Sequence, residues 1–547
     1  MKYFVFDVET WGLDATPESF ALGVILGENY VFRTDNLAVF KRELMSSKYN
    51  NCVLFAHNAL YDLSTIFGNI LVDLDPQAVF NNSTFILAKH GKITYADSFN
   101  ILPTKLEKVG EMMGVPKGIT PAKFKTCKRS KITNADYDYC ENDCFVIYEA
   151  LTKLFNEIGC VRITLASLSM AYFRRKFLKE PIYYNDIVYH FFDSYFGGRV
   201  ECFRLGKVHA QVFDINSMYP YSMKIATFPH PQKLRVNNSP KESDLRFSLE
   251  YNEGLAEITV LHKEHFYGFL PIKKDGKLIF PTGKFRGTWN FPEIRYALEQ
   301  GIIEILEIHR IVDAPPMETP FREFVDTLFE KRRSADNEFE KYLYKIILNS
   351  LYGKFAQKKK FRTRYVKDLR DVFIPINAKV VQFAQDRSDA YIVEELDFYG
   401  YNTIPVFSSY ITSISRVLLL KYMVKYIENE VVYVDTDCIA VNNYIKEVET
   451  GGYLGNFKLE KDKIISKIIG NKVYETVDGE ITVKGVKKGS TRLSDGVFVN
   501  KQMIKPKTAL RRNMKAGSFI TTIKKISSKY DKRAVFSDGS TKPLKLK

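Results

Sequence analysis

Residues 433–437 read YVDTD, between the segments NEVV and CIAV. Successive strand side chains point to opposite faces, so a β-strand here would place Tyr433, Asp435 and Asp437 on one face. Two carboxylates about 7 Å apart on an apolar strand resist burial unless a cation lies beside them. An exposed hairpin turn is the alternative for an isolated pair of this kind. The segment therefore predicts a strand that binds a divalent metal, provided that other carboxylates accompany it.

The composition indicates a large globular protein. A chain of 547 residues can form two to four domains, and 45% hydrophobic with 14% aromatic residues excludes a disordered chain. Asp7 and Glu9 interrupt the opening apolar run, and we expect no signal peptide, no membrane span and no membrane partner. The seven cysteines include no CxxC pair, which predicts reduced, mostly buried thiols in a soluble, intracellular protein, in the host cytoplasm if it is viral.

The positive charge is concentrated near the C-terminus. Of the net +16, residues 484–547 contribute 18 Lys plus Arg against three Asp, whereas the first 165 residues hold 17 basic and 19 acidic groups. A basic region with interleaved aromatic residues suits a surface that follows a phosphate backbone. A solvated tail is the alternative, but the apolar residues Phe519, Ile520 and Ile523 favour a folded element.

The pattern along the chain predicts an α/β first domain over residues 1–165. Alternating strands and helices are its signature. A strand over 208–223 and β-rich sequence to about 290 follow, and no internal repeat is present. The helices and strands expected on this basis are a strand in KYFVFDVET, a strand, turn and helix over 53–70, a helix over 133–157, a long helical stretch over 318–356, and a helix over 410–428 that leads into YVDTD.

A first group of carboxylates lies in DVET, HNALYD and YCENDC. Asp7 and Glu9 share one strand face, Asp62 begins a helix, and Asp143 follows Tyr139 by one helical turn. Four carboxylates can hold two divalent ions about 3.5–4 Å apart, one activating a water and the other stabilising a leaving oxygen of a phosphodiester. Tyr139 would orient that water.

These residues resemble the DEDD exonuclease superfamily, in its form with tyrosine in the third motif. The resemblance implies a ribonuclease H-like domain that removes nucleotides 3′→5′ from a DNA primer end. It implies that Thr10 and Asn58 contact the single-stranded end and that Phe55 stacks on a base. Lys117, in VPKG, matches a lysine of protein-primed relatives, whereas we expect His57 to pack or hydrogen-bond rather than bind metal.

A second group pairs carboxylates with a lysine-bearing helix. Asp214 lies in VFDINSMYP, and KYLYKIILNSLYGKF follows before YVDTD. In this predicted helix Asn349 and Ser350 are poor mid-helix residues without an evident structural need, which argues against an ordinary surface helix. Lysines opposite paired aspartates suit a nucleoside triphosphate. The helix has one face of Lys341, Lys345, Asn349 and Tyr352, and an opposite face of Leu343, Ile346, Ile347 and Leu351.

The three blocks together resemble motifs A, B and C of family B DNA polymerases. The resemblance implies a right-hand polymerase domain with an α+β palm, helical fingers and a thumb. It implies two divalent ions (Mg²⁺ or Mn²⁺) per active site, held by Asp214, Asp437 and the carbonyl of Ile215, with Asp435 in support.

The same resemblance implies how a deoxynucleoside triphosphate (dNTP) is held. Lys345 would contact the triphosphate, helped by Lys341 and by the basic cluster 331–333 that ends in Arg333. Tyr219 would stack under the sugar and exclude a 2′-hydroxyl. Asn349 and Tyr352 would line the nascent base pair.

Further motifs are expected to contact the primer-template. YFGGRV resembles the YxGG motif between the exonuclease and polymerase domains, where glycines let backbone amides approach phosphates. KVY resembles the KxY motif that holds the primer strand. The residues expected on DNA here are Tyr195, Gly197, Gly198, Ser217, Lys472, Tyr474 and Lys484.

We expect no domain before Asp7, and this compactness is similar to the protein-primed branch of bacteriophages and linear plasmids. In that branch, insertions after motifs A and B contact a priming terminal protein and enclose the DNA for strand displacement. Asp435 follows Asn349 by 86 positions, which leaves room for one such insertion. The expected parts of a polymerase domain over 166–547 are insertions at 225–320 and 357–400, fingers at about 321–356, and a thumb with basic tail at about 475–547.

The sequence therefore predicts a replicative, proofreading DNA polymerase, with a terminal protein and a single-stranded DNA-binding protein as further partners. An exonuclease with a non-catalytic DNA-binding C-terminal half and a primer-independent polymerase are the alternatives. A DNA-packaging protein would leave seven ordered carboxylates unexplained. The sequence argues against a nucleotide-hydrolysing motor, because Gly283-Lys284 is followed by Phe285 rather than Ser or Thr.

Overall fold

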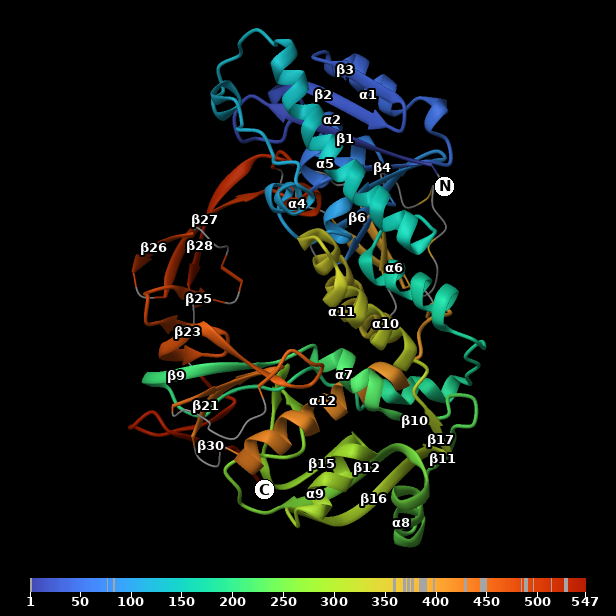
Figure 1. Cartoon of the computed structure of the whole chain (residues 1–547), viewed down its shortest axis with the longest axis vertical. Helices are drawn as coiled ribbons and strands as arrows, with labels where there is room; N and C mark the ends of the chain where they lie inside the picture. The colour runs from blue at the N-terminus through green and yellow to red at the C-terminus, as the bar shows by residue number, and fades with distance from the viewer. Residues whose placement is uncertain are drawn as a thin grey trace.

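The computed structural model (Figure 1) describes most of the chain. Among the described residues, no helix is both long enough and apolar enough to cross a membrane. All seven cysteines are free thiols and four are buried, which confirms the predicted thiol state. The described residues are 2–75, 77–81, 84–357, 361–366, 370, 374, 378–382, 391–396, 399–426, 430–442, 450–483, 485–486, 490–494, 496–512, 514–525 and 530–547.

The N-terminal part is a seven-stranded sheet in the order β3-β2-β1-β4-β7-β6-β5, at the top of Figure 1. Alternate residues of β1 face opposite layers, so Val5 packs with α5 while Phe6 and Val8 pack with α2. Asp7 and Glu9 alternate with Val8, which places them on the α5 side of the sheet. The elements are β1 (Tyr3–Thr10), β2 (Phe20–Gly27), β3 (Tyr30–Thr34), α1 (Leu37–Leu44), β4 (Val53–Ala56), α2 (Leu60–Phe67), α3 (Ile70–Asp73), β5 (Val79–Asn81), β6 (Thr84–His90), β7 (Ile93–Asp97), α4 (Leu106–Met113) and α5 (Asn134–Ile158).

A second seven-stranded sheet, entirely antiparallel, forms the centre of the molecule in the order β25-β24-β23-β9-β22-β21-β8. The predicted strand over 208–223 is wrong in its second half. It ends at Ile215, and a left-handed Ser217 (φ 50°) turns the chain into α7. The elements are β8 (Val200–Cys202), β9 (Gly206–Ile215), α7 (Met218–Ile225), β21 (Val431–Asp435), β22 (Cys438–Val441), β23 (Phe457–Gly470), β24 (Val473–Thr476) and β25 (Ile481–Val483).

Helices link the two sheets. The predicted long helical stretch over 318–356 consists of two consecutive helices, α10 (Arg322–Ser334) and α11 (Glu338–Phe355). The Asn337 side chain caps α11 by accepting a hydrogen bond from the Glu340 amide at 2.9 Å. Two further helices pack on α11: α6 (Leu165–Tyr172), and α12 (Pro405–Tyr426), which confirms the predicted helix that leads into YVDTD.

The predicted first insertion forms a sheet of its own, in the order β11-β16-β12-β15-β31, at the opposite end of the molecule from the N-terminal sheet (Figure 1). Its last strand comes from the C-terminus and runs parallel to β15. The described parts of the predicted second insertion form a small antiparallel sheet. The elements are β10 (Thr227–Pro229), β11 (Arg235–Asn237), α8 (Glu242–Tyr251), β12 (Glu253–His262), β13 (Ile272–Lys274), β14 (Lys277–Ile279), β15 (Thr282–Asn290), α9 (Phe291–Glu299), β16 (Ile303–Ala314), β17 (Pro316–Glu318), β31 (Lys545–Leu546), and, in the second insertion, β18 (Phe361–Val366), β19 (Ala378–Gln382) and β20 (Tyr391–Leu396).

The basic C-terminal region contains folded elements, which rules out the solvated tail for its described residues. β26 (Thr491–Ser494), β27 (Val497–Met503) and β28 (Phe519–Lys525) form a sheet, followed by β29 (Arg533–Val535) and β30 (Thr541–Pro543). The loop around α13 (Pro506–Arg512) docks on the N-terminal part. Ala15 donates its amide to the carbonyl of Gly517 at 2.9 Å, and Phe519 donates to the Asp14 carboxylate at 2.9 Å.

Replacing Gly517 by alanine is expected to loosen this docking. Gly517 has φ +88°, and an added Cβ would overlap the carbonyl of Ala15. Gly276→Ala is the matched control, because Gly276 has φ +72° but open space around it. Both variants carry about 1–2 kcal/mol of backbone strain. Hydrogen exchange should become faster around residues 14–18 and 504–519 in Gly517→Ala alone, and equal protection there in both variants would contradict the prediction.

Candidate active sites

The four predicted carboxylates of the N-terminal part come together where β1 ends. β1 carries Asp7 and Glu9, α2 carries Asp62 and α5 carries Asp143. The Val8 amide donates to Asp62 Oδ1 at 3.2 Å, which ties α2 to the strand. α5 itself is fixed by a capping box at Thr133 and by a left-handed Gly159 at its end.

Burial and mutual repulsion disfavour the ionised forms of the carboxylates in this cluster. Burial, with help from neighbouring Asp143, raises the pKa of Asp7 to about 7. Burial and Asp7 also raise the pKa values of Glu9 and Asp62 well above their ordinary values. The Lys117 ammonium lies 2.6 Å from Asp143 Oδ2, but Asp143 Oδ1 is buried without a hydrogen-bond partner among the described residues. Oxygen donors with uncompensated charge fit divalent cations.

The surroundings of the cluster include residues that the sequence did not single out. The Tyr139 hydroxyl is hydrogen-bonded to Thr120 at 2.9 Å, and the Cys140 thiol donates to Asp7 Oδ2 at 3.4 Å. Cys140 lies inside the YCENDC motif, whereas no local signal marks Thr120. His57 is bonded to Ser98 and to a backbone carbonyl, which confirms its predicted packing role.

The residues predicted to contact a single-stranded end are placed differently from one another. Asn58 is exposed, with φ 69°, and its amide donates to Asp97 at 2.9 Å. The prediction for Phe55 is wrong, because this side chain is 0% exposed and packs inside the domain, out of reach of a base. Thr10 is also buried, and its hydroxyl bonds to Tyr61 at 2.6 Å, so it shapes the loop rather than facing an open surface.

The YVDTD segment is a hairpin and not one strand. β21 ends at Asp435, Thr436 adopts a left-handed φ of 65°, and β22 begins at Cys438. The expectation that Asp437 continues the strand is therefore wrong, because this residue lies in a two-residue turn. Strand pairing sets Cys438 opposite Asp214, and the Ile215 amide donates to the carbonyl of Asp437 at 2.8 Å.

Asp214 and Asp437 form a second electronegative centre. Burial, the neighbouring Asp437 and Glu460 raise the pKa of Asp214 to about 7, against an opposing effect of Lys345. Burial also raises the pKa of Asp437. Two carboxylates whose ionised forms are both disfavoured, next to the backbone of Ile215, fit divalent cations as the first centre does.

Asp435 has a different environment. Lys472 forms an ion pair with its carboxylate, and the hydroxyls of Tyr433 and Thr436 donate to it at 3.1 and 3.2 Å. The Lys472 amide in turn donates to the Tyr433 hydroxyl at 3.2 Å. Asp435 is therefore already compensated, which suits the supporting role predicted for it. Tyr474 is buried beside Tyr433.

α11 presents its predicted polar face toward this centre. Lys345 is exposed and lies close enough to lower the pKa of both aspartates. The rings of Tyr219 and Tyr352 are 4.4 Å apart, centroid to centroid. Asn349 is half-buried, and Lys341 pairs with Glu338 at 2.9 Å. Ser350 does have a structural role, contrary to expectation, because its hydroxyl bonds to Ser169 at 2.5 Å.

The three residues of the basic cluster 331–333 make different contacts. Lys331 binds Glu157 of α5 at 2.6 Å, which joins the two parts of the chain. Arg333, the predicted triphosphate contact, instead pairs with Glu330 at 3.1 Å. Arg332 is the member that faces motif A, since it donates to the Ser217 hydroxyl at 3.4 Å. The triplet itself gave no signal that the middle residue points inward.

The YFGG loop is held by contacts that the motif alone did not reveal. A Cβ on Gly198 would lie 2.7 Å from a side-chain carbon of Thr436, so the loop must approach the motif C turn without a side chain. Arg416 donates to the carbonyl oxygens of Phe196 and Gly197 at 2.7 and 3.0 Å. Tyr195 is half-buried, and the predicted contact at Lys484 lies outside the described residues.

The chain has a carboxylate pair in a hairpin on an antiparallel sheet, and a lysine-bearing helix faces this pair. An α/β domain with its own carboxylate cluster precedes them. Together these features define a nucleic-acid polymerase with an exonuclease-type domain. The model of the family described as DNA polymerase type B, organellar and viral, matches residues 123–419, more than half of the chain. The chain belongs to this family and is a DNA-directed DNA polymerase.

Similar proteins agree with this assignment. The chain is 25% identical to the DNA-directed DNA polymerase of Enterobacteria phage PRD1, over 92% of this chain and 88% of that one. It is 26% identical to a probable DNA polymerase of Neurospora intermedia over 64% of this chain, and it spans 36% of that longer protein. Phi29 DNA polymerase, in a complex with primer-template DNA and incoming nucleotide, has the same fold, with a TM-score of 0.72 at 18% identity, covering 96% and 99% of the two chains. These likenesses confirm the predicted family and fold class.

Metal removal is expected to show which centre the cations occupy. The pKa of Asp214 is raised from 3.8 to about 7, so between these values the folded chain keeps a proton that the unfolded chain releases. Without metal, the free energy of unfolding therefore falls as the pH rises through this window. A divalent cation replaces the proton, so Mg²⁺ should raise the melting temperature more at about pH 8 than at about pH 5.

The control is Asp214→Asn, whose side chain has no proton to lose. In this variant the additional stabilisation at the higher pH should shrink, while the part that comes from the N-terminal carboxylates remains. An equal gain from Mg²⁺ at both pH values in the unaltered chain would contradict a metal site at Asp214. Thermal unfolding with Mg²⁺ or with EDTA measures both quantities.

Proposed function

We propose that this chain replicates DNA, adding nucleotides at one centre and removing mispaired ones 3′→5′ at the other. The register that brings Asp214 beside Asp437, with Lys345 of α11 facing them, carries the proposal for synthesis. The buried cluster around Asp7 carries the proposal for proofreading.

In synthesis, Asp214, Asp437 and the carbonyl of Ile215 would hold two divalent ions, which supply activation of the primer 3′-hydroxyl and neutralise the leaving pyrophosphate. Lys345 binds the triphosphate of the incoming nucleotide. Tyr219 stacks under its sugar, where a 2′-hydroxyl would collide with the ring.

Other side chains complete the synthesis site. Arg332 takes the place beside motif A that was predicted for Arg333, and its guanidinium is positioned for a phosphate. Asn349 and Tyr352 line the nascent pair. The Lys472 ammonium neutralises Asp435, so the metal ions would be bound by Asp214 and Asp437 instead.

In proofreading, Asp7, Glu9, Asp62 and Asp143 would hold two further ions that generate a nucleophilic water. Tyr139, fixed through Thr120, orients that water. The Lys117 ammonium balances Asp143 and is available to the scissile phosphate. Asn58 contacts the frayed primer end.

We further propose that a terminal protein supplies the priming hydroxyl. The sheet built from β12, β15 and β16 within residues 225–320 offers a separate surface for it, and the small sheet within 357–400 would enclose the DNA during strand displacement. A single-stranded DNA-binding protein would cover the displaced strand. The proposed division is an exonuclease domain over 1–165 and a polymerase domain over 166–547, with fingers at about 321–356 and a thumb at about 475–547.

Separate variants should separate the two activities. Asp7→Ala with Glu9→Ala is expected to lower degradation of a 5′-labelled primer more than about 100-fold and to spare its extension. Asp437→Ala should do the reverse, because each change removes ligands from one centre only. A gel assay on a primer annealed to a longer template, with Mg²⁺ and with or without dNTPs, measures both.

The outcomes distinguish the alternatives. If the unaltered chain shortens the primer even with dNTPs present, the C-terminal half is a DNA-binding platform and not a polymerase. If either variant loses both activities equally in a folded protein, two separate metal centres are excluded.

The mode of starting can be tested on a linear template without an oligonucleotide primer. We expect no product from the chain alone, and a product whose migration shifts after protease digestion once a protein with a priming hydroxyl, encoded by the same genome, is added. Synthesis by the chain alone would establish the primer-independent alternative instead.

A further inference from the structure

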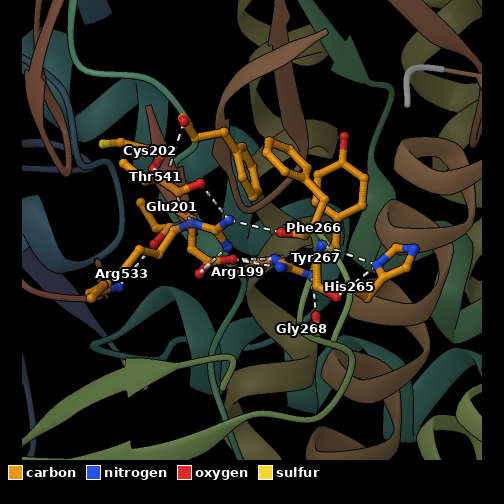
Figure 2. Close-up of polar contacts among 12 residues, drawn as sticks. Arg199, Glu201, Cys202, His265, Phe266, Tyr267, Gly268, Arg533 and Thr541 are labelled. Carbon is orange, nitrogen blue, oxygen red and sulfur yellow. Dashed lines mark hydrogen bonds and ion pairs between the residues drawn. The ribbon is translucent and has the colours of Figure 1, made fainter. Parts of the chain in front are cut away.

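Two arginines and one glutamate form a fully buried charge cluster between motif YFGGRV and the C-terminal segment (Figure 2). Arg199, Glu201 and Arg533 are 1%, 0% and 2% exposed. Glu201 lies between the guanidinium groups, with Arg199 nitrogens 2.6 and 2.7 Å from Oε2 and Arg533 Nη1 3.5 Å from Oε1. Neither active centre includes these three side chains.

Other donors of the two arginines bind backbone and hydroxyl oxygens, whereas Arg199 Nη2, Arg533 Nη1 and Glu201 Oε1 have ion-pair contacts but no hydrogen bond within the described part of the chain. Arg199 donates to the carbonyl of Gly268 at 2.9 Å, while Arg533 donates to Thr541 Oγ1 and to the carbonyl of Phe266, both at 2.8 Å. A buried charge without partners is costly, so this geometry permits little displacement of any member. The cluster therefore fastens the C-terminal segment to β8 and to the backbone at Phe266 and Gly268, through the contacts drawn in Figure 2.

Side chains of the same C-terminal segment also form hydrogen bonds with the backbone of strand β8. The Cys202 amide donates to the Tyr530 hydroxyl at 2.9 Å, and Lys532 donates to the carbonyl of Val200 at 3.0 Å. Thr541 Oγ1 is 2.9 Å from the carbonyl of Cys202. β8 is the last strand of its sheet, and these contacts cover the edge that would otherwise be open.

β8 in turn supports the motif C hairpin. Asp435 pairs with Val200 across the β8–β21 ladder, and the Thr436 amide donates to the carbonyl of Arg199 at 2.7 Å. Thr436 has a left-handed backbone, a conformation that persists only where its surroundings hold it. The hydrogen bond to the carbonyl of Arg199 supplies such a restraint at Thr436, the residue directly before Asp437.

We infer that Arg533 is a positioning residue for the polymerase centre, acting through Glu201 and Arg199 on the turn that presents Asp437. The inference rests on the proposed function of that centre. The simpler interpretation is that the cluster only fastens the C-terminal segment. The two differ in what a small change should alter, because a displaced metal ligand affects metal dependence and turnover, whereas a loosened tail lowers stability alone.

Arg533→Lys in the full chain tests the inference, since lysine keeps the charge but cannot reach all three oxygen partners. We expect kcat for single-nucleotide incorporation to fall roughly 10- to 100-fold, in the range that misplacement by about 1 Å produces. The Mg²⁺ concentration for half-maximal incorporation should rise. The KM for dNTP and the exonuclease rate on single-stranded DNA should stay within about twofold, because Lys345, Tyr219 and the Asp7 cluster are untouched.

Lys545→Ala is the matched control, because it removes an exposed ion pair with Glu264 from the same segment. It should leave all four quantities unchanged. Thr541→Val, which removes one acceptor of Arg533 and keeps all charges, serves as a milder second variant if Arg533→Lys lowers the folded fraction. It should give the same effects in smaller size.

Unchanged kcat and Mg²⁺ dependence in folded variants would overturn the inference while leaving the proposed function intact. Parallel loss of synthesis and exonuclease activity, tracking the melting temperature, would also overturn it in favour of simple fastening. Absence of synthesis by the unaltered chain would overturn the proposed function itself, and the inference with it.

Discussion

Repulsion between buried carboxylates is the constraint on which both centres depend. Asp7 and Asp214 each lie beside another acid in surroundings that disfavour their ionised forms, so the fold must hold them together against their own charge. It does so by placing them on central strands of two sheets, where hydrogen bonding on both sides resists displacement. β1 lies between β2 and β4, and β9 lies between β22 and β23. Bound cations would offset the cost of bringing these carboxylates together.

The two centres also balance charge in a parallel way. In each, one lysine pairs with one acid and leaves the others uncompensated: Lys117 with Asp143, and Lys472 with Asp435. Each lysine thus neutralises a single acid of its group. Placement by a loop in one case and by a hairpin turn in the other indicates that the electrostatic requirement, rather than a shared local structure, determines the arrangement.

Sequence patterns predicted the carboxylates, the family and most elements, because periodicity and motif order are local properties. They failed where the backbone conformation, or packing against residues distant in the sequence, determines the position of a side chain. The two-residue period of a strand could not reveal the left-handed turn at Thr436. Phe55 was expected to stack on a base, but its side chain is buried. Arg332 and Arg416 were missed because the direction of a side chain on a helix depends on which neighbours cover that helix.

The C-terminal region shows why such long-range features matter for function. It carries much of the positive charge expected on DNA, yet its described residues also contact earlier parts of the chain at three places: the N-terminal domain through Gly517, strand β8 through Arg533, and strand β15 through β31. Each contact joins segments hundreds of residues apart, so the basic C-terminal region is fixed relative to both centres. A tail that only bound phosphate would need none of these contacts. Their presence indicates that the C-terminal region also helps to fix the backbone around both carboxylate centres.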